Sequence, residues 1–231
     1  MIQQPAWQFD ELSQVGVDYA DPAEVAAYEE RHRRFRDLDG ENRRLIERLG
    51  LSGHETLIDI GSGTGLFILA AAPHCAKIHA VDVSEAMLAF AQGRAKEAGV
   101  ANIAFHRGGF LTYEHAGEPA DVIVTAAALH HLPDFWKQVG LNRLAAMLKP
   151  GGRLYVKDVV WSFDPAGYRA FFDGWLADTP AVRDQALVHA RQEFSTTAWI
   201  MEGLLERAGL TIESVEHHGG FMAEYFCRRR E

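Results

Sequence analysis

The sequence is poor in cysteine and in basic residues, and each shortage excludes a class of protein. Its two cysteines, Cys75 and Cys227, lie far apart and form no Cys-x-x-Cys pair, so neither a disulfide framework nor a zinc site of that type is expected. Lysine and arginine number 23 against 32 aspartate and glutamate residues, a formal net charge of −9. A nucleic-acid binder needs the opposite balance to displace counterions from phosphates. We therefore expect no nucleic-acid partner.

No signal-peptide pattern is visible in the sequence, and long apolar runs are absent from it. Residues 1–5 contain neither the basic stretch nor the apolar run of a signal peptide. The longest apolar runs, such as residues 66–73, are too short to cross a bilayer. The 231 residues are 48% hydrophobic and 24% charged, which is typical of a globular protein with a sizeable core. We expect a cytoplasmic protein without a membrane partner, and composition predicts nothing about its oligomeric state.

Hydrophobic patterning divides the chain into an N-terminal segment and one larger domain. Residues 1–50 hold scattered aromatic residues and a charged helical run from residue 22, which predict a helical cap segment. Residues 51–231 alternate short apolar strands with helices, as in a parallel sheet covered on both faces. An aromatic-rich stretch at about 162–194 breaks the alternation, and we expect it to be a cap insertion. The predicted strands are residues 56–60, 77–81, 102–106, 120–125, 153–160, 210–215 and 222–227, and the main helices 65–72, 84–98, 135–148 and 196–208.

A glycine-rich turn follows the first predicted strand, in the sequence Leu57-Ile-Asp-Ile-Gly-Ser-Gly-Thr-Gly65. Such glycines allow a sharp turn and let a ligand approach the main chain closely. Residue 66 is leucine, which breaks the Gly-x-Gly-x-x-Gly spacing of dinucleotide binding, and the lysine of a phosphate-binding loop is absent. Asp59 instead favours a cationic ligand, because a carboxylate would repel a pyrophosphate. Asp82 ends the second strand, where an acid can bind both ribose hydroxyls.

With these motifs, the chain resembles the class I S-adenosylmethionine-dependent methyltransferases, most closely their small-molecule (UbiE-like, type 11) group. The resemblance covers roughly residues 55–160 and rests on Leu57–Gly65, Val81–Leu88, Asp121–Pro133 and Leu148–Leu154. It implies an α/β, Rossmann-like, doubly wound fold with a seven-stranded mixed sheet, a final antiparallel hairpin strand and a helical cap. It also implies that S-adenosylmethionine is the cofactor and that a small-molecule acceptor receives its methyl group.

The resemblance further implies which residues contact the cofactor. Asp59 would lie near the methionine amino group, and Asp82 would hold the ribose hydroxyls. Thr125 and Ala126 would contact the ligand through their backbones. The full implied set is Asp59, Gly61, Ser62, Gly63, Asp82, Val83, Met87, Gly109, Phe110, Thr125 and Ala126.

One position departs from the family pattern. Members have an acid after the third strand that hydrogen-bonds the adenine amino group, whereas this chain reads Arg107-Gly-Gly-Phe110. Gly109 supplies no carboxylate, so adenine recognition is expected to rest on backbone groups and Phe110. Losing one such hydrogen bond costs about 1 kcal/mol, which binding can survive. If the carboxylate is simply missing, Gly109→Asp should strengthen binding modestly.

Candidate residues for the acceptor come from the N-terminal segment and from the ends of the fourth and fifth strands. Tyr28, His32 and Arg36 share one face of a helix, which is either a lid over the methyl donor or an ordinary amphipathic face. His130 can accept a proton near neutral pH, so His130 and Tyr28 are the catalytic candidates, whereas His131 is expected to brace the next helix. The full candidate set is Tyr19, Tyr28, His32, Arg36, His130, Asp158 and Trp161.

The catalytic residues themselves stay open at this point. Methyl transfer from a sulfonium depends mainly on proximity, so no fixed catalytic set is demanded. No histidine and carboxylate set has metal-ligand spacing, and we expect no metal. Two other functions also remain: intramolecular cyclisation or elimination that releases methylthioadenosine, which a closed aromatic cap would favour, and non-catalytic cofactor binding.

Overall fold

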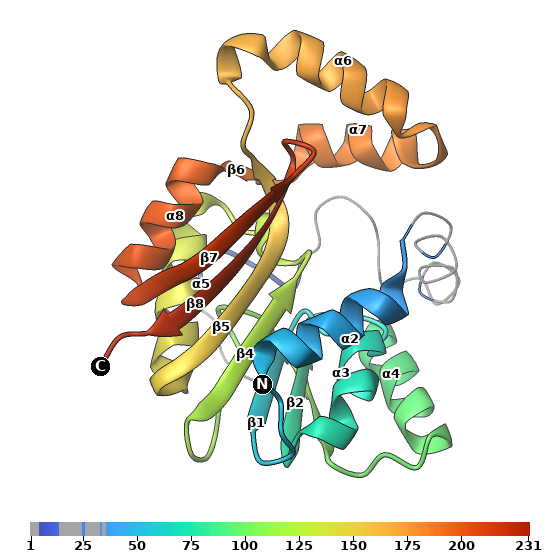
Figure 1. The fold of residues 1–231 in the computed structure, drawn as a ribbon, viewed down its shortest axis with the longest axis vertical. Coiled ribbons are helices and arrows are strands. Elements are labelled where there is room, and N and C mark those ends of the chain that lie inside the picture. Colours follow the sequence, from blue (N-terminus) through green and yellow to red (C-terminus); the bar gives the residue numbers. More distant parts are fainter. Residues whose placement is uncertain (1–4, 14–24, 26–32, 34–35) are drawn as a thin grey trace.

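The described residues of the chain, 5–13, 25, 33 and 36–231, fold in the computed structural model around one mixed β-sheet (Figure 1). Seven strands follow the order β3-β2-β1-β4-β5-β8-β7, and β6 pairs with β5 beside this path. Neighbours from β3 to β5 are parallel, whereas β8 is antiparallel to both β5 and β7. The strands are β1 (Thr56–Ile60), β2 (Lys77–Asp82), β3 (Ile103–Arg107), β4 (Ala120–Ala126), β5 (Leu148–Trp161), β6 (Thr196–Thr197), β7 (Leu210–His218) and β8 (Met222–Arg229).

This architecture confirms the expected doubly wound, seven-stranded mixed sheet with an antiparallel strand at its end. The two-residue strand β6 was not predicted, since a segment that short carries no hydrophobic pattern. The parallel strands are apolar on both faces because both faces are covered, and Leu57 and Ile58 of β1 are each fully buried.

Helices cover the two faces of the sheet and divide the core in two (Figure 1). One cluster packs Leu141 of α5 and Leu205 of α8 against the sheet, and the other packs Leu49 of α2 and Ile68 of α3. The sequence also ends these helices, since Gly50 follows α2 in the left-handed conformation and its N–H bonds the Glu47 carbonyl. The helices are α2 (Leu38–Leu49), α3 (Leu66–Ala71), α4 (Glu85–Glu97), α5 (Asp134–Met147) and α8 (Ala198–Arg207).

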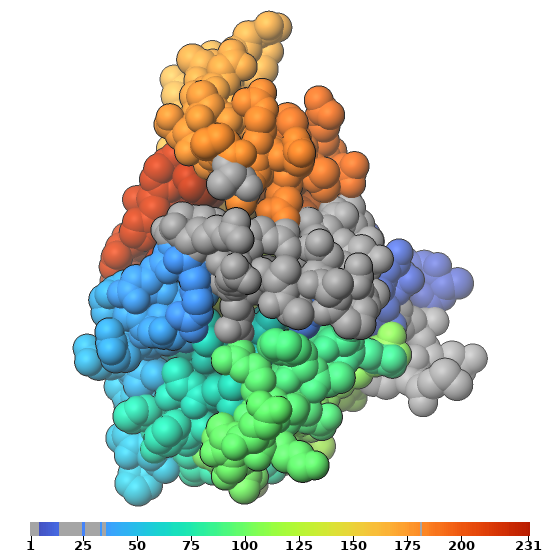
Figure 2. Space-filling model, turned by 90° about the vertical axis from the view of Figure 1, so that its right-hand side faces the viewer, coloured from blue at the N-terminus to red at the C-terminus, as the bar shows by residue number. Residues whose placement is uncertain are grey.

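The stretch expected to be a cap insertion contains two helices, α6 (Tyr168–Asp178) and α7 (Arg183–Gln192). They lie beyond the end of β5, and in the space-filling view their orange atoms form the top of the molecule (Figure 2). The expected N-terminal cap segment covers residues 1–50. Within its first 35 residues, only 5–13, 25 and 33 belong to the described residues. Among the helices that the structure describes, none combines the length and apolar character needed to cross a membrane.

The strand order fixes where a ligand can enter. The chain moves from β1 outward to β2 and β3, and then returns to the other side of β1 as β4. Between β1 and β4 the connections leave in opposite directions, so a crevice forms at the carboxyl ends of these strands.

Candidate active site

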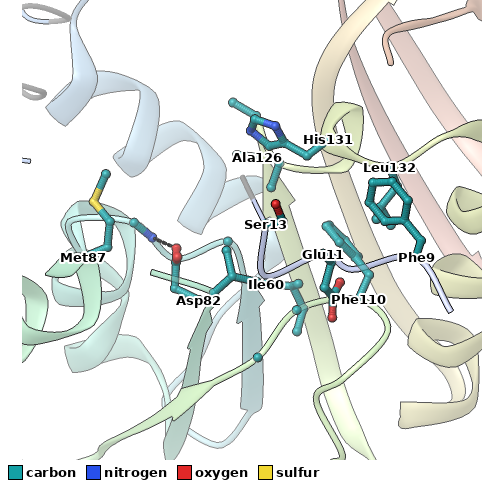
Figure 3. Close-up of a pocket in the computed structure, with 17 residues that line it drawn as sticks. Phe9, Glu11, Ser13, Ile60, Asp82, Met87, Phe110, Ala126, His131 and Leu132 are labelled. Atoms are coloured by element: carbon teal, nitrogen blue, oxygen red, sulfur yellow. Dashed lines mark hydrogen bonds between the residues drawn. The ribbon is translucent and has the colours of Figure 1, made fainter. Parts of the chain in front are cut away.

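A cavity opens at this switch point, at the carboxyl ends of β1, β2 and β4 (Figure 3). Its described walls are the turns after these strands and after β3, together with a short piece of the N-terminal segment. The lining residues are Phe9, Glu11, Ser13, Ile60, Gly61, Gly63, Asp82, Val83, Met87, Gly108, Gly109, Phe110, Ala126, Ala127, Ala128, His131 and Leu132. Eight residues of the implied cofactor-binding set are among them: Gly61, Gly63, Asp82, Val83, Met87, Gly109, Phe110 and Ala126.

The turns after β1 and β4 lie so close together that the turn after β1 needs a glycine at position 61. Gly61 has a φ of +80°, and a Cβ added there would lie 2.5 Å from the Cβ of Ala128. Opposite it, Ala127 has a φ of +52°, a conformation that non-glycine residues rarely adopt. Its N–H donates to the Lys157 carbonyl at 2.8 Å, which holds the turn in place. Backbone strain of this kind gathers at ligand sites, where the surrounding structure enforces it.

Asp82 is one of two acids, with Glu11, among the described residues that line the cavity. Its Oδ2 accepts the N–H of Gly63 at 2.8 Å and its Oδ1 accepts that of Ser84 at 2.9 Å, which fixes the side chain at the end of β2 (Figure 3). Burial raises the pKa of Asp82, although these hydrogen bonds act in the opposite direction. Because a carboxylate has about four acceptor positions, two remain for hydroxyl groups of a ligand.

Asp59 lies behind the cavity wall in the middle of the sheet and is only 4% exposed. Burial, and next the Asp82 carboxylate, raise the pKa of Asp59 to about 8. The carboxyl group is therefore mostly neutral near pH 7, and a cation placed close to it would favour its ionised form. A cationic ligand suits this arrangement, and a second anion would not.

The carboxylate that Gly109 lacks is supplied to the same place by Glu11. The Glu11 side chain is buried, and its Oε1 accepts the Leu111 N–H at 3.0 Å and the Thr112 hydroxyl at 2.6 Å. A Cβ added to Gly109 would lie 2.6 Å from Glu11 Oε2, so the glycine makes room for this carboxylate. Burial raises the pKa of Glu11 against the effect of these hydrogen bonds. Nothing in the sequence around Glu11 marks it, and the missing acid at position 109 was the one available signal.

The two neighbouring histidines occupy different surroundings. His131 lines the cavity, and its Nδ1 has no hydrogen-bond partner among the described residues. Burial, and then His130, lower the pKa of His131 to about 4, so the ring is neutral and only weakly basic. His130 does not line the cavity: its Nδ1 lies 2.5 Å from Asp158 Oδ1 and its Nε2 lies 3.3 Å from Glu193 Oε2. Burial disfavours a charged ring, but the Asp158 and then the Glu193 carboxylate outweigh it and raise the pKa of His130.

The other predicted residues lie away from the cavity wall. The hydroxyls of Ser62 and Thr125 are buried and have no hydrogen-bond partner within the part of the chain that the structure describes. Arg36 pairs with Glu41 at 2.5 Å. Trp161 packs against the aromatic rings of the insertion, with its ring centroid 5.2 Å from that of Phe172. Three candidates fall outside the described residues: Tyr19, Tyr28 and His32.

Comparison with known proteins agrees with this geometry. Residues 57–152 match the family described as "Methyltransferase domain". The uncharacterized methyltransferase YcgJ of Bacillus subtilis is 32% identical over 155 residues, which is 67% of this chain and 57% of that protein. A ubiquinone biosynthesis O-methyltransferase of Pseudomonas fluorescens is 30% identical over 154 residues, 60% of this chain and 63% of that protein. The chain thus spans about three fifths of the length of these two relatives.

Solved structures share the fold. The crystal structure of YcgJ has a TM-score of 0.66 at 17% identity and covers 84% of this chain and 99% of that one. The N-methyltransferase NodS of Bradyrhizobium japonicum, in complex with S-adenosyl-L-homocysteine, has a TM-score of 0.61 at 20% identity over 85% of this chain and 90% of that one. At such low identity these likenesses establish the Rossmann-like architecture alone.

Proposed function

We propose that this chain transfers a methyl group from S-adenosylmethionine to a small-molecule acceptor, because residues 57–152 match the methyltransferase family. The observation that carries the proposal is that two acids, Asp82 and Glu11, line the switch-point cavity, while a third acid, Asp59, is buried in the strand next to Asp82. The P. fluorescens relative, whose name places it in ubiquinone biosynthesis, supports a small acceptor. A cytoplasmic location is part of the same proposal, supported by two buried cysteines that are both free thiols.

The cavity offers a partner for each polar portion of the cofactor. Asp82 has acceptor capacity for the two ribose hydroxyls, and its charge is held in place by two backbone amides. Asp59 would act as a counter-charge for the cationic methionine portion, because a nearby cation favours the ionised form of its buried carboxyl group. The turn at Gly61 and Gly63 lets the ligand approach the backbone.

Glu11 completes this proposed site on the adenine side. Its carboxylate covers Gly109 and neighbours Phe110 on the cavity wall, where an exocyclic amine could donate to it (Figure 3). Met87 and Phe110 also line the cavity and provide apolar surfaces for a planar base. Phe9, Glu11 and Ser13 thereby bring the described part of the N-terminal segment to the cavity.

Methyl transfer requires the protein mainly to position the two reactants and to exclude water. S-adenosylmethionine supplies an electrophilic methyl group, whose S–C bonding electrons return to sulfur as the acceptor attacks. A pKa of about 4 makes His131 a poor base, so it is better suited to line the cavity as a neutral ring than to take a proton from the acceptor. The proton that an O–H, N–H or S–H acceptor loses would pass to solvent, so neither His131 nor Asp82 would need to change its protonation state.

Product analysis tests this proposal. The full chain would be incubated with S-adenosylmethionine, alone and with a panel of small phenols, amines and thiols, and the products followed by mass spectrometry. We expect acceptor-dependent release of S-adenosylhomocysteine that Asp82→Ala abolishes. Methylthioadenosine release without an acceptor would contradict methyl transfer and support cyclisation or elimination. Tight binding with no turnover across the panel would count against catalysis.

A further inference from the structure

Three ligand-type side chains converge outside the cavity, where the insertion meets the sheet. His130 follows β4, whereas His189 lies on α7 and Glu193 caps its end. One nitrogen of each ring and one carboxylate oxygen lie within 4.8 Å of one another. Glu193 Oε2 is 3.3 Å from His130 Nε2 and also contacts His189 Nδ1. His189 and Glu193 are one helical turn apart, so their side chains share a face.

The remaining nitrogen of each ring is already engaged, which aims the other one inward. His130 Nδ1 lies 2.5 Å from Asp158 Oδ1, and the backbone N–H of His130 donates to Asp158 Oδ2 at 3.1 Å. His189 Nε2 lies 2.7 Å from the Ser195 hydroxyl. Histidines that bind metal ions are typically oriented in this way, by a carboxylate or another polar group on the opposite nitrogen.

The backbone around the cluster is fixed by partners of its own. The Phe194 N–H donates to the His130 carbonyl at 2.8 Å, which ties the residue after Glu193 to the turn that carries His130. The Thr196 hydroxyl donates to Asp134 at 3.1 Å, and the fully buried Lys137 binds both Asp134 and the Phe194 carbonyl. Hydrogen bonds therefore fix the backbone around these three side chains.

The charges in this cluster favour a cation. Asp158 and Glu193 bring two carboxylates into a space whose side chains are almost fully buried, with relative exposures of 1% for Asp158 and 6% for Glu193. The cationic Lys137 is directed to Asp134 and to a carbonyl instead. Two imidazoles and a carboxylate suit zinc or a similar divalent transition ion, whereas magnesium and calcium prefer oxygen ligands.

The geometry points to a divalent transition-metal site, of the zinc type, formed by His130, His189 and Glu193 and supported by Asp158 and Ser195. The ion would join the insertion to the sheet, because two ligands come from α7 and its end and the third from the turn after β4. The sequence predicted no such site, since the spacing along the chain separates His130 from the other two. The site stands independently of the proposed methyl transfer, because its test measures metal binding.

Zinc titration of the full chain tests the site. After treatment with a chelator and dialysis, the protein would be titrated with zinc chloride by calorimetry, and its zinc content measured by mass spectrometry. We expect one zinc ion per chain with a dissociation constant of about 1 μM or below. His189→Ala and Glu193→Gln should weaken binding by about 100-fold or more, and Asp158→Asn by roughly 10- to 100-fold. His54→Ala, which removes an exposed histidine elsewhere, should leave binding unchanged.

Two further readouts separate a metal site from a set of ion pairs. Cobalt(II) should give visible absorption bands in the wild-type protein and in His54→Ala, and lose them in Glu193→Gln. Zinc should raise the melting temperature of the wild type but not of Glu193→Gln, whose near-identical shape preserves the fold. Equal zinc affinity in the wild type and in Glu193→Gln would overturn the proposal. So would the absence of zinc binding, since the cluster would then be an ion-pair network alone.

Discussion

The two sides of the crevice are built in different ways. On the side proposed to bind the cofactor, the turn after β1 carries Gly61 and Gly63, and the last residue of β2 is Asp82. On the cap side, contacts join segments far apart in the chain: Glu11 packs on Gly109 at the cavity, and Glu193 lies beside His130 outside it, where the insertion meets the sheet. The first kind of site can be recognised from a local motif, and the second depends on the tertiary fold.

The turn at Gly61 gives the largest expected effect on the cofactor side. Gly61→Ala combines a left-handed backbone with a Cβ 2.5 Å from that of Ala128, so the unfolding free energy should fall by about 2–5 kcal/mol. Gly63→Ala is the matched control: its φ is +52°, but nothing lies within 4 Å of the added Cβ, so about 1–2 kcal/mol is expected. Urea titration measures both. Equal losses would show that the close approach of the two turns is unimportant.

Asp59 predicts a pH dependence of stability on the same side. Its pKa is raised from 3.8 to about 8, so the native state holds a proton that the unfolded state releases between these values. Stability of the ligand-free protein should therefore fall as pH rises from about 4 to 8, by at most about 1.4 kcal/mol per pH unit.

A variant pair isolates this contribution. Asp59→Asn cannot ionise, so its stability relative to the wild type should increase steadily between pH 6 and 8 in urea titrations. Asp121→Asn is the control: burial raises the pKa of that acid, but hydrogen bonds from Lys149 and Thr56 outweigh it and the pKa is lowered. The effect of Asp121→Asn should thus be constant over this pH range. A flat difference for Asp59→Asn would contradict the raised pKa.

Variants of Glu11 and Gly109 test whether the Glu11 carboxylate takes part in binding the cofactor. Glu11→Ala should weaken binding of S-adenosylmethionine about tenfold, the value of one hydrogen bond to a charged group. Gly109→Asp should also weaken binding, because its side chain would meet Glu11 within 2.6 Å and bring two carboxylates together. This reverses the expectation drawn from the sequence, in which the glycine left the position empty.

The double variant sharpens the same test. Glu11→Ala combined with Gly109→Asp leaves one carboxylate at this place, so it should bind more tightly than either single variant. Calorimetry on the three variants gives the answer. If Glu11→Ala alone stays within twofold of the wild type, Glu11 plays no part in binding the cofactor.

The cap side should yield the smallest change in cofactor binding. Trp175 packs among the aromatic rings of the insertion, and its buried indole N–H has no hydrogen-bond partner among the described residues. Trp175→Phe preserves an aromatic ring and removes this donor. We expect the acceptor KM to rise about fivefold, as for one neutral hydrogen bond, with the cofactor affinity within twofold of the wild type. A loss of cofactor affinity with an unchanged acceptor KM would show that the insertion affects the cofactor and not the acceptor.

The sequence anticipated the fold and one wall of the site because both depend on local patterns. Alternating apolar segments predicted β1 to β4 to within one residue at each end and β5 with a start five residues too late, but not the two-residue parallel strand β6. The glycine turn and Asp82 lie at the cavity. Glu11 could not be predicted in this way, because its position follows from a tertiary contact with residues 109–112, about 100 positions away in the chain. His131 and His130 are adjacent in sequence, so only the direction of each ring, set by Asp158 and the cap, separates their surroundings.

The central claim is that the cavity at Asp82 binds the methyl donor, and calorimetric titration with the non-reactive product S-adenosylhomocysteine tests it most directly. Asp82→Ala removes charge-assisted hydrogen bonds to the ribose, so its affinity should be at least about tenfold weaker than that of the wild type. Asp121 lies near the start of β4, at the strand end away from the cavity, so Asp121→Asn should bind like the wild type. Equal affinity in the wild type and in Asp82→Ala would contradict the assignment of this cavity.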